Sequence, residues 1–169
     1  PAGRRLVVAL DGVEDPQNVG AILRAAEGAG ATGCVLPERH APPLGGAVAR
    51  ASAGALEHLP VARVVNLARA LERLKEARFW VVALDPEAEV SLFAAPDSVW
   101  KGDLVLVLGG EGQGLRHGIR KQADHRLSIP MAGDVDSTDD LVARTADAHR
   151  DSGIDLRMST EVVAADLVA

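Results

Sequence analysis

The sequence predicts an α/β fold, a parallel sheet with helices on both faces, from three observations. Short, almost wholly apolar runs such as residues 6–10 and 104–108 recur along the chain, as expected for strands buried on both faces. Alanine-rich or amphipathic stretches at helical spacing separate these runs. Glycine and proline stand at many of the junctions. Alternating strands and helices imply a parallel sheet that is covered on both sides.

The expected elements follow one another in a simple order. The apolar runs predict strands at residues 6–10, 33–36, 61–65, 79–84 and 104–108. Helices are expected at residues 20–29, 45–55, 67–77 and 114–123. Gly30 ends the first helix, a Pro-Pro pair precedes the second, and Asn66 caps the third. No internal repeat or second domain is evident before Gly133.

The chain changes character after Gly133. Thr138 is an N-cap candidate for a helix that runs to about Arg150, and residues 154–158 and 162–168 are typical of two short strands. Residues 134–169 carry nine acidic and three basic side chains, which accounts for the whole net charge of −6. The first 133 residues are therefore neutral, so the net charge does not exclude a nucleic-acid partner for them.

Composition argues against several other classes of protein and of binding site. No apolar run has transmembrane length, and residues 1–5 lead at once into a strand-like segment rather than a secretory core, so we expect a cytoplasmic protein. Cys34 lies in an apolar run, which predicts a buried, inert thiol, and no His/Cys cluster has metal-ligand spacing. With two Phe, two Trp and no Tyr, base stacking cannot dominate any RNA binding.

The first candidate motif, residues 10–26, joins a strand end to a polar turn and a helix start. Pro16 fixes φ in the turn, and the Asn18 side chain can bond back to the backbone. With a helix beginning near Gly20, Arg24 lies on its second turn and off the apolar face. Taken alone, these features would be an ordinary turn and a surface arginine.

The second motif, residues 109–114, is a glycine-rich run after a buried strand, where backbone can approach a ligand without a Cβ in the way. It matches neither the dinucleotide fingerprint nor the triphosphate loop, because Leu115-Arg116 stands where Lys-Ser/Thr is needed. A third run, residues 128–133, follows. Beside the second motif, five basic residues predict either a local face for phosphates or a solvated helix face: Arg116, His117, Arg120, Lys121 and Arg126.

In order and spacing, the three runs resemble the motifs of the SpoU-type (TrmH-type) RNA 2'-O-ribose methyltransferases of the SPOUT superfamily, over about residues 4–133. The resemblance implies S-adenosylmethionine as cofactor, RNA as partner and methyl transfer to a ribose 2'-hydroxyl. It also implies a C-terminal trefoil knot and a homodimer whose site uses both subunits. Within the family the run through Gly133 looks closest to enzymes that methylate a guanosine in ribosomal RNA rather than transfer RNA.

The resemblance also implies roles for particular residues. The catalytic residues it implies are Asn18, Arg24, Glu111 and Ser137. The cofactor-binding residues it implies are Leu108, Gly109, Gly110, Ile129, Pro130, Met131 and Thr138. No metal is required. Because a guanidinium stays protonated in proteins, Arg24 is expected to hold an RNA phosphate and to stabilise a developing oxyanion rather than to act as a base.

Residues 1–133 are therefore interpreted as the catalytic domain, and residues 134–169 as an atypical C-terminal tail. The family continues with Ser-Leu-Asn-Val-Ser and a closing helix, whereas this chain has Thr138 for the leucine, Asp139 for the asparagine and a strand-like ending. The knot is then incomplete and methyl transfer weak or absent, which makes a non-catalytic RNA-binding protein an alternative. Residues 149–157 are similar to part of a flavin-dependent ferredoxin reductase, so a nicotinamide or flavin oxidoreductase fragment is a further alternative.

Overall fold

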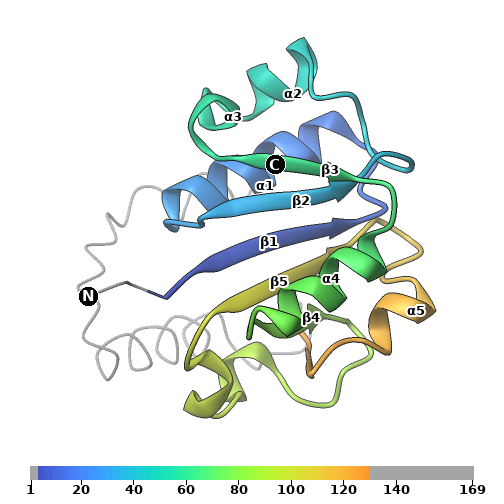
Figure 1. The fold of residues 1–169 in the computed structure, drawn as a ribbon. Helices are drawn as coiled ribbons and strands as arrows, with labels where there is room; N and C mark the ends of the chain where they lie inside the picture. The colour runs from blue at the N-terminus through green and yellow to red at the C-terminus, as the bar shows by residue number, and fades with distance from the viewer. Residues whose placement is uncertain (1–3, 130–169) are drawn as a thin grey trace, which may run out of the picture. The chain divides into compact units, whose positions relative to one another are not determined.

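A computed structural model describes residues 4–129, and six strands of this part form one parallel sheet (Figure 1). The strands are β1 (Leu6–Asp11), β2 (Gly33–Pro37), β3 (Val61–Val64), β4 (Trp80–Leu84), β5 (Leu104–Gly109) and β6 (His125–Leu127). Their order in the sheet is β3-β2-β1-β5-β4-β6, and every pairing is parallel. The predicted fold class is thus confirmed, as are five of the strands within a residue or two.

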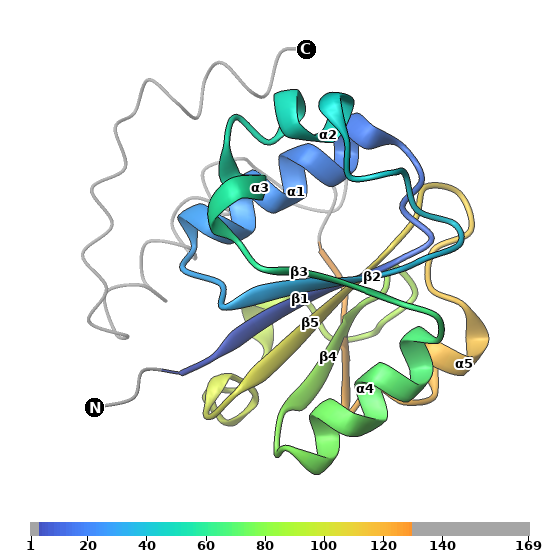
Figure 2. The same cartoon turned by 45° about the horizontal axis from the view of Figure 1, so that its top comes forward.

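Helices cover both faces of the sheet, as Figure 2 shows. One face carries α1 (Pro16–Gly28), α2 (Gly46–Ala51) and α3 (Ala55–His58), and the other carries α4 (Leu67–Glu76) and α5 (His117–Arg120). Two short 3₁₀ turns, η1 (Leu92–Ala94) and η2 (Asp97–Trp100), lie between β4 and β5.

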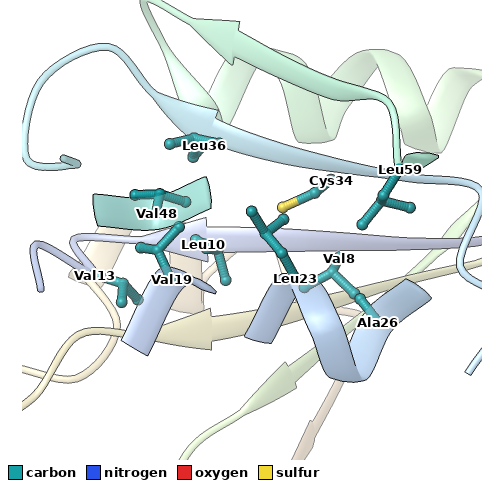
Figure 3. Close-up of a cluster of buried hydrophobic side chains, with 10 residues drawn as sticks. All are labelled: Val8, Leu10, Val13, Val19, Leu23, Ala26, Cys34, Leu36, Val48 and Leu59. Atoms are coloured by element: carbon teal, nitrogen blue, oxygen red, sulfur yellow. The ribbon is translucent and has the colours of Figure 1, made fainter. Parts of the chain in front are cut away.

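The core is split by the sheet into two main layers because side chains alternate along each strand. Val8 and Leu10 of β1 point toward α1, where they meet Leu23 in the cluster drawn in Figure 3. Ala9, between them, belongs to the opposite layer with Leu67 and other residues under α4. The two central strands, β1 and β5, are therefore covered on both faces of the sheet, which explains why their sequences are continuously apolar.

Helix α1 begins at Pro16, four residues before the predicted start at Gly20. The segment interpreted as a rigid turn is the helix N-terminus itself: Asp15 is the N-cap, its Oδ1 accepts a hydrogen bond from the Gln17 backbone N at 2.9 Å, and Pro16 is the first helical residue. Proline suits that position because its missing N–H would have no intrahelical partner.

Three other expectations about elements were wrong. The helix expected over residues 45–55 is divided into α2 and α3, because Ala53 and Gly54 adopt positive φ values of 48° and 93°. The helix expected over residues 114–123 is the single turn α5. Strand β6 was not predicted, since only Leu127 of its three residues is buried and apolar. The helix and strands expected after residue 134, and the knot, lie outside the described residues.

The strand order places a topological switch point between β1 and β5. From β1 the chain passes to β2, toward one edge of the sheet, and from β5 it passes across β4 to β6, toward the other. The connections leaving the two neighbouring strands diverge, which opens a crevice at their carboxyl ends. The first sequence motif, residues 10–26, and the second, residues 109–114, both begin in this crevice.

Candidate functional site

A cavity of about 510 Å³ lies at the carboxyl ends of β1 and β5. Its lining comes chiefly from the two loops that leave these strands, together with the first turn of α1 and the start of the loop after β2. The lining residues are Asp11, Gly12, Val13, Glu14, Asp15, Asn18, His40, Gly110, Glu111, Gln113, Gly114 and Arg116. The first and second sequence motifs thus meet in one polar cavity, although they lie more than ninety residues apart.

Asn18 and Glu111 are the two predicted catalytic residues that the structure brings together. Asn18 Nδ2 donates a hydrogen bond to Glu111 Oε1 at 2.7 Å. The Asn18 side chain therefore crosses to the opposite loop instead of bonding back to its own backbone, as the turn interpretation expected. Glu111 is exposed and Asn18 is half-buried, so the pair forms part of the cavity wall and is open to a ligand.

Asp11 holds the second loop against the end of β1. The Asp11 carboxylate is 1% exposed and accepts hydrogen bonds from the Arg116 backbone N at 2.8 Å and from Arg116 Nε at 2.7 Å. A buried carboxylate is tolerated when it is paired and hydrogen-bonded in this way. Asp11 was not among the predicted site residues; its only signal in the sequence was an acid at the end of an apolar strand.

The glycines of the second motif are required by the packing of the loop itself. A Cβ on Gly110 would lie 2.0 Å from the Gly12 carbonyl oxygen, and a Cβ on Gly109 would lie 2.4 Å from the Gly114 carbonyl carbon. The Gly110 backbone N also donates to the Asp11 carbonyl oxygen at 2.9 Å. The absence of a side chain allows contact between two loops at Gly110 and contact within one loop at Gly109. Of the predicted cofactor residues Leu108, Gly109 and Gly110, only Gly110 lines the cavity.

Arg24 is not among the residues that line the cavity. Because α1 begins at Pro16, Arg24 is on the third helical turn rather than the second, at about 3.6 residues per turn. Its side chain is exposed and makes no ion pair within residues 4–129. The structure thus confirms that Arg24 is off the apolar face, and it does not place this residue beside Asn18 and Glu111.

The remaining predicted cofactor residues are only partly described. Leu108 is half-buried near the end of β5, where it packs against the core cluster under α1. Ile129 follows β6 and is 48% exposed, beside Ser128, whose backbone N donates to the Val90 carbonyl oxygen at 2.9 Å. Pro130, Met131, Ser137 and Thr138 lie outside the described residues.

Three arginines of the predicted basic cluster are bound to carboxylates. Arg116 pairs with Asp11, while Arg126 Nε lies 3.0 Å and Arg120 Nε 3.3 Å from Asp85 Oδ2. Asp85 directly follows β4 and is 1% exposed, so its two pairs hold α5 and β6 against the carboxyl end of β4. These three side chains therefore do not form a free phosphate face, although Arg116 and Arg126 are exposed.

His40 also lines the cavity and was missed by the sequence analysis. Its Nδ1 lies 2.9 Å from Glu14 Oε1, and both side chains are exposed. His40 has a positive φ of 61°, an uncommon conformation for a residue with a Cβ. A lone histidine in the stretch after β2 gave no sequence signal that could distinguish it from any other loop residue.

Cys34 is buried within the cluster under α1, as predicted. Burial raises the pKa of its thiol to about 12, so it is protonated and unreactive at neutral pH. In residues 4–129 no group of three or more His, Cys, Asp and Glu side chains could hold a metal ion. No helix in the same part of the chain is long and apolar enough to cross a membrane.

The cavity combines four carboxylates and the Asn18 amide at a switch point of a parallel sheet. Its volume falls within the range of about 300–1,000 Å³ that is usual for small-molecule sites. Carboxylate and amide groups can orient the hydroxyl groups of a sugar, and the Asn18–Glu111 hydrogen bond fixes both groups for that purpose. The geometry thus favours a polar, hydroxyl-bearing ligand.

Comparison with known proteins agrees with this arrangement. Residues 5–138 match the model of the SpoU rRNA Methylase family. The chain is 45% identical over 141 residues to the 23S rRNA (guanosine-2'-O-)-methyltransferase RlmB of Xanthomonas campestris, covering 83% of this chain and 55% of that protein. It therefore spans about half the length of the curated relatives that it matches.

Solved structures resemble the fold closely. The SpoU methyltransferase AviRb from Streptomyces viridochromogenes, in complex with AdoMet, has a TM-score of 0.68 at 29% identity, covering 86% of this chain and 59% of that one. An AdoMet-bound rRNA methyltransferase from Sinorhizobium meliloti has a TM-score of 0.67 at 30% identity, covering 86% and 56%.

Proposed function

The chain belongs to the SpoU rRNA Methylase family, and from this premise we propose that it transfers a methyl group from S-adenosylmethionine to a ribose 2'-hydroxyl of RNA. The observation that carries the proposal is the Asn18–Glu111 pair, which joins the first two motifs in one cavity at the switch point. Family membership favours methyl transfer over the nicotinamide or flavin oxidoreductase alternative.

The described residues fit S-adenosylmethionine in their chemistry. Ile129 offers exposed apolar surface after β6, and the half-buried Leu108 lies near the end of β5, close in sequence to Gly110, which lines the cavity. Apolar walls with a few polar backbone groups are typical of sites for such cofactors. Pro130, Met131 and Thr138 would complete this site, and their roles stay predictions.

S-adenosylmethionine, when bound, supplies a methyl group activated by a sulfonium. In such a transfer the methyl–sulfur bond would break as the ribose oxygen gains the methyl group, leaving a neutral thioether, and the hydroxyl proton would pass to water. The chain would therefore have to align the ribose and favour the developing negative charge. We assign the alignment of the ribose to Asn18 and Glu111. Arg24, which stays protonated, holds an RNA phosphate and stabilises the developing oxyanion, and Ser137 completes the predicted catalytic set.

We further propose that the RNA is ribosomal, with guanosine as the methylated nucleotide. The name of the relative at 45% identity supports this assignment. A homodimer whose site uses both subunits is also proposed. The exposure of Arg24, which does not line the cavity that holds Asn18 and Glu111, supports it, since the partner subunit would then supply the arginine. A cytoplasmic location follows from ribosomal RNA as substrate.

The experiment that tests the activity combines two measurements on the full chain. Isothermal calorimetry with S-adenosylmethionine should give saturable binding, and a 23S ribosomal RNA transcript should then acquire labelled methyl groups from the cofactor. Cofactor binding together with methyl transfer to RNA is the expected result. Neither binding nor transfer, for a chain shown to be folded by circular dichroism, would contradict the proposal.

A second candidate is a methyltransferase-like protein that binds RNA with weak or no catalysis. Two observations favour it: the family match ends at residue 138, and Asp139 puts a carboxylate where the family has an asparagine. A chain whose residues from Asp134 onward are replaced by a family-like ending provides the comparison. Faster methyl transfer by the replaced chain would support impairment, and equal turnover and equal cofactor affinity would exclude it.

A further inference from the structure

Two further cavities continue the candidate site along the carboxyl edge toward α4. The first, of about 410 Å³, shares His40 and Arg116 with the site cavity. The second, of about 480 Å³, shares Val65 and Asn66 with the first. Shared lining residues make the three cavities one continuous path. We call the two outer cavities the arginine groove, after the Arg39, Arg69 and Arg73 side chains that line them.

The arginine groove differs sharply in charge from the site that it adjoins. The site cavity is lined by four carboxylates, Asp11, Glu14, Asp15 and Glu111. Among described residues, the groove lining includes no acidic side chain. The groove is therefore basic, while the cavity that would hold the reacting group is acidic.

The arginines that name the groove have no carboxylate partner in the part of the chain that the structure describes. Within residues 4–129, Arg39, Arg69 and Arg73 make no ion pair, whereas Arg116 and Arg120 are bound to carboxylates. All three are exposed. Their charges are thus available to an anionic ligand, unlike those of the cluster that the sequence suggested as a phosphate face.

Helix α4 presents two of these side chains together. Arg69 and Arg73 are four residues apart, which places them on the same side of the helix one turn apart. Asn66 caps α4 by accepting a hydrogen bond from the backbone N of Arg69, so the Arg69 side chain is not used in the cap. In Figures 1 and 2, α4 lies beside α5, next to the loops of the candidate site.

We propose that the arginine groove binds the phosphate backbone of the RNA on one side of the nucleotide held in the candidate site. The proposal rests on the proposed function, because it assumes that RNA is the substrate. A guanidinium pairs with phosphate through two parallel hydrogen bonds, and a row of such groups follows a strand without reading its sequence. Val65, 85% exposed, gives apolar surface for a ribose or base between the arginines.

The groove is tested by RNA affinity as a function of salt. Fluorescence anisotropy of a labelled single-stranded RNA of mixed sequence would be measured with the parent chain and with an Arg69→Ala/Arg73→Ala variant. On a single strand each phosphate contact contributes about 0.7 to the slope of log affinity against log salt. The double variant should therefore lose roughly 1.4 in slope and bind roughly 25-fold more weakly near 0.1 M salt.

Lys101→Ala is the matched control. Lys101 is exposed, lies outside the groove and precedes β5, at the opposite edge of the sheet. It should leave the slope and the affinity close to those of the parent. An equal loss in this control would show a general effect of net charge and would overturn the assignment to the groove.

Cofactor affinity and methyl transfer separate this inference from the proposed function. If the parent binds and methylates RNA while the Arg69→Ala/Arg73→Ala variant keeps the parental salt slope, the arginine groove does not bind RNA phosphates and the proposed function stands. If the variant has a smaller salt slope but the parent does not methylate RNA, RNA binding by the arginine groove stands and the proposed methyl transfer is wrong. Unchanged S-adenosylmethionine affinity and melting temperature in the variant are expected, since neither arginine touches the core.

Discussion

Asn18 and Glu111 illustrate what single residues of this chain reveal through sequence alone. Their motifs predicted a shared site, and the 2.7 Å hydrogen bond between them confirms that they meet. The direct hydrogen bond between the two side chains was not predictable. Asn18 was expected to bond to nearby backbone, because short polar side chains commonly bond in this way in turns. Placing Pro16 inside the helix turns Asn18 toward the opposite loop instead.

Asp11 and the buried Asp85 show which residue contacts could not be predicted from the sequence. Both are acids at the ends of buried strands, and both hold arginines that the sequence analysis took as a basic cluster. Their partners lie 105 and 41 residues away, so a local pattern gives no sign of the pairing. Counting charges within one segment therefore overestimated the free positive charge near the second motif and overlooked the arginines of α4.

Arg24 gives the first prediction at the residue scale. Arg24→Ala should abolish methyl transfer if this side chain holds an RNA phosphate and stabilises the developing oxyanion. The free energy of unfolding should change by about 0.5 kcal/mol or less, because Arg24 is exposed and unpaired within residues 4–129. Turnover and chemical denaturation of the same preparation provide the check.

A structural role for Arg24 would give the opposite pattern. In that case Arg24→Ala would lower stability markedly, while activity per folded molecule would stay at the parental level. Arg24→Lys is the conservative companion: it keeps the positive charge but not the planar, two-pronged geometry. Partial recovery of turnover in the lysine variant is expected from a phosphate-binding role.

At the scale of elements, apolar runs predicted strands well and helix ends poorly. Strands β1 and β5 are buried on both faces, so burial alone dictates their composition. The ends of helices depend on single residues: Asp15 begins α1 early, and the positive φ of Gly54 divides the helix expected over residues 45–55. Strand β6 is held by pairing with β4 rather than by its own composition, so its sequence gave no signal.

The glycine-rich loop after β5 carries the second prediction. Gly110→Ala should destabilise the protein by several kcal/mol or displace the loop, because the new Cβ would lie 2.0 Å from backbone of the facing loop, which cannot move aside like a flexible side chain. Thermal melting and hydrogen exchange of the loop would measure the effect. Loss of cofactor binding in a Gly109 or Gly110 variant therefore reports on loop packing as well as on the cofactor.

Gly28→Ala is the matched control for Gly110→Ala. Gly28 is the last residue of α1, and a Cβ there would meet nothing within 4 Å. Alanine at this helical position should be neutral or stabilising by up to about 1 kcal/mol. Equal melting temperatures for Gly110→Ala and the parent would show that the loops can separate without cost, contrary to the packing described here.

At the scale of the whole molecule, the sequence predicted a parallel sheet covered on both faces but not the order of its strands. That order brings β1 beside β5, two strands separated by most of the chain, and so creates the switch point where the cavity lies. Pairing between distant runs of similar composition leaves no local trace. The knot and the predicted tail elements concern residues outside those described, and they stay predictions.

The central claim is that the Asn18–Glu111 cavity aligns a ribose for methyl transfer. The most direct measurement is mass spectrometric quantification of 2'-O-methylguanosine in a 23S ribosomal RNA transcript after incubation with S-adenosylmethionine. It compares the parent with Asn18→Ala and Glu111→Gln, and with Gln17→Ala as the control, since Gln17 is exposed on the same helical turn and does not line the cavity.

We predict methylation by the parent and by Gln17→Ala, and a loss of about 100-fold or more in turnover for Asn18→Ala and Glu111→Gln at unchanged cofactor affinity. Parental turnover in both of these variants, or RNA left without 2'-O-methylguanosine by the folded parent, would contradict the claim.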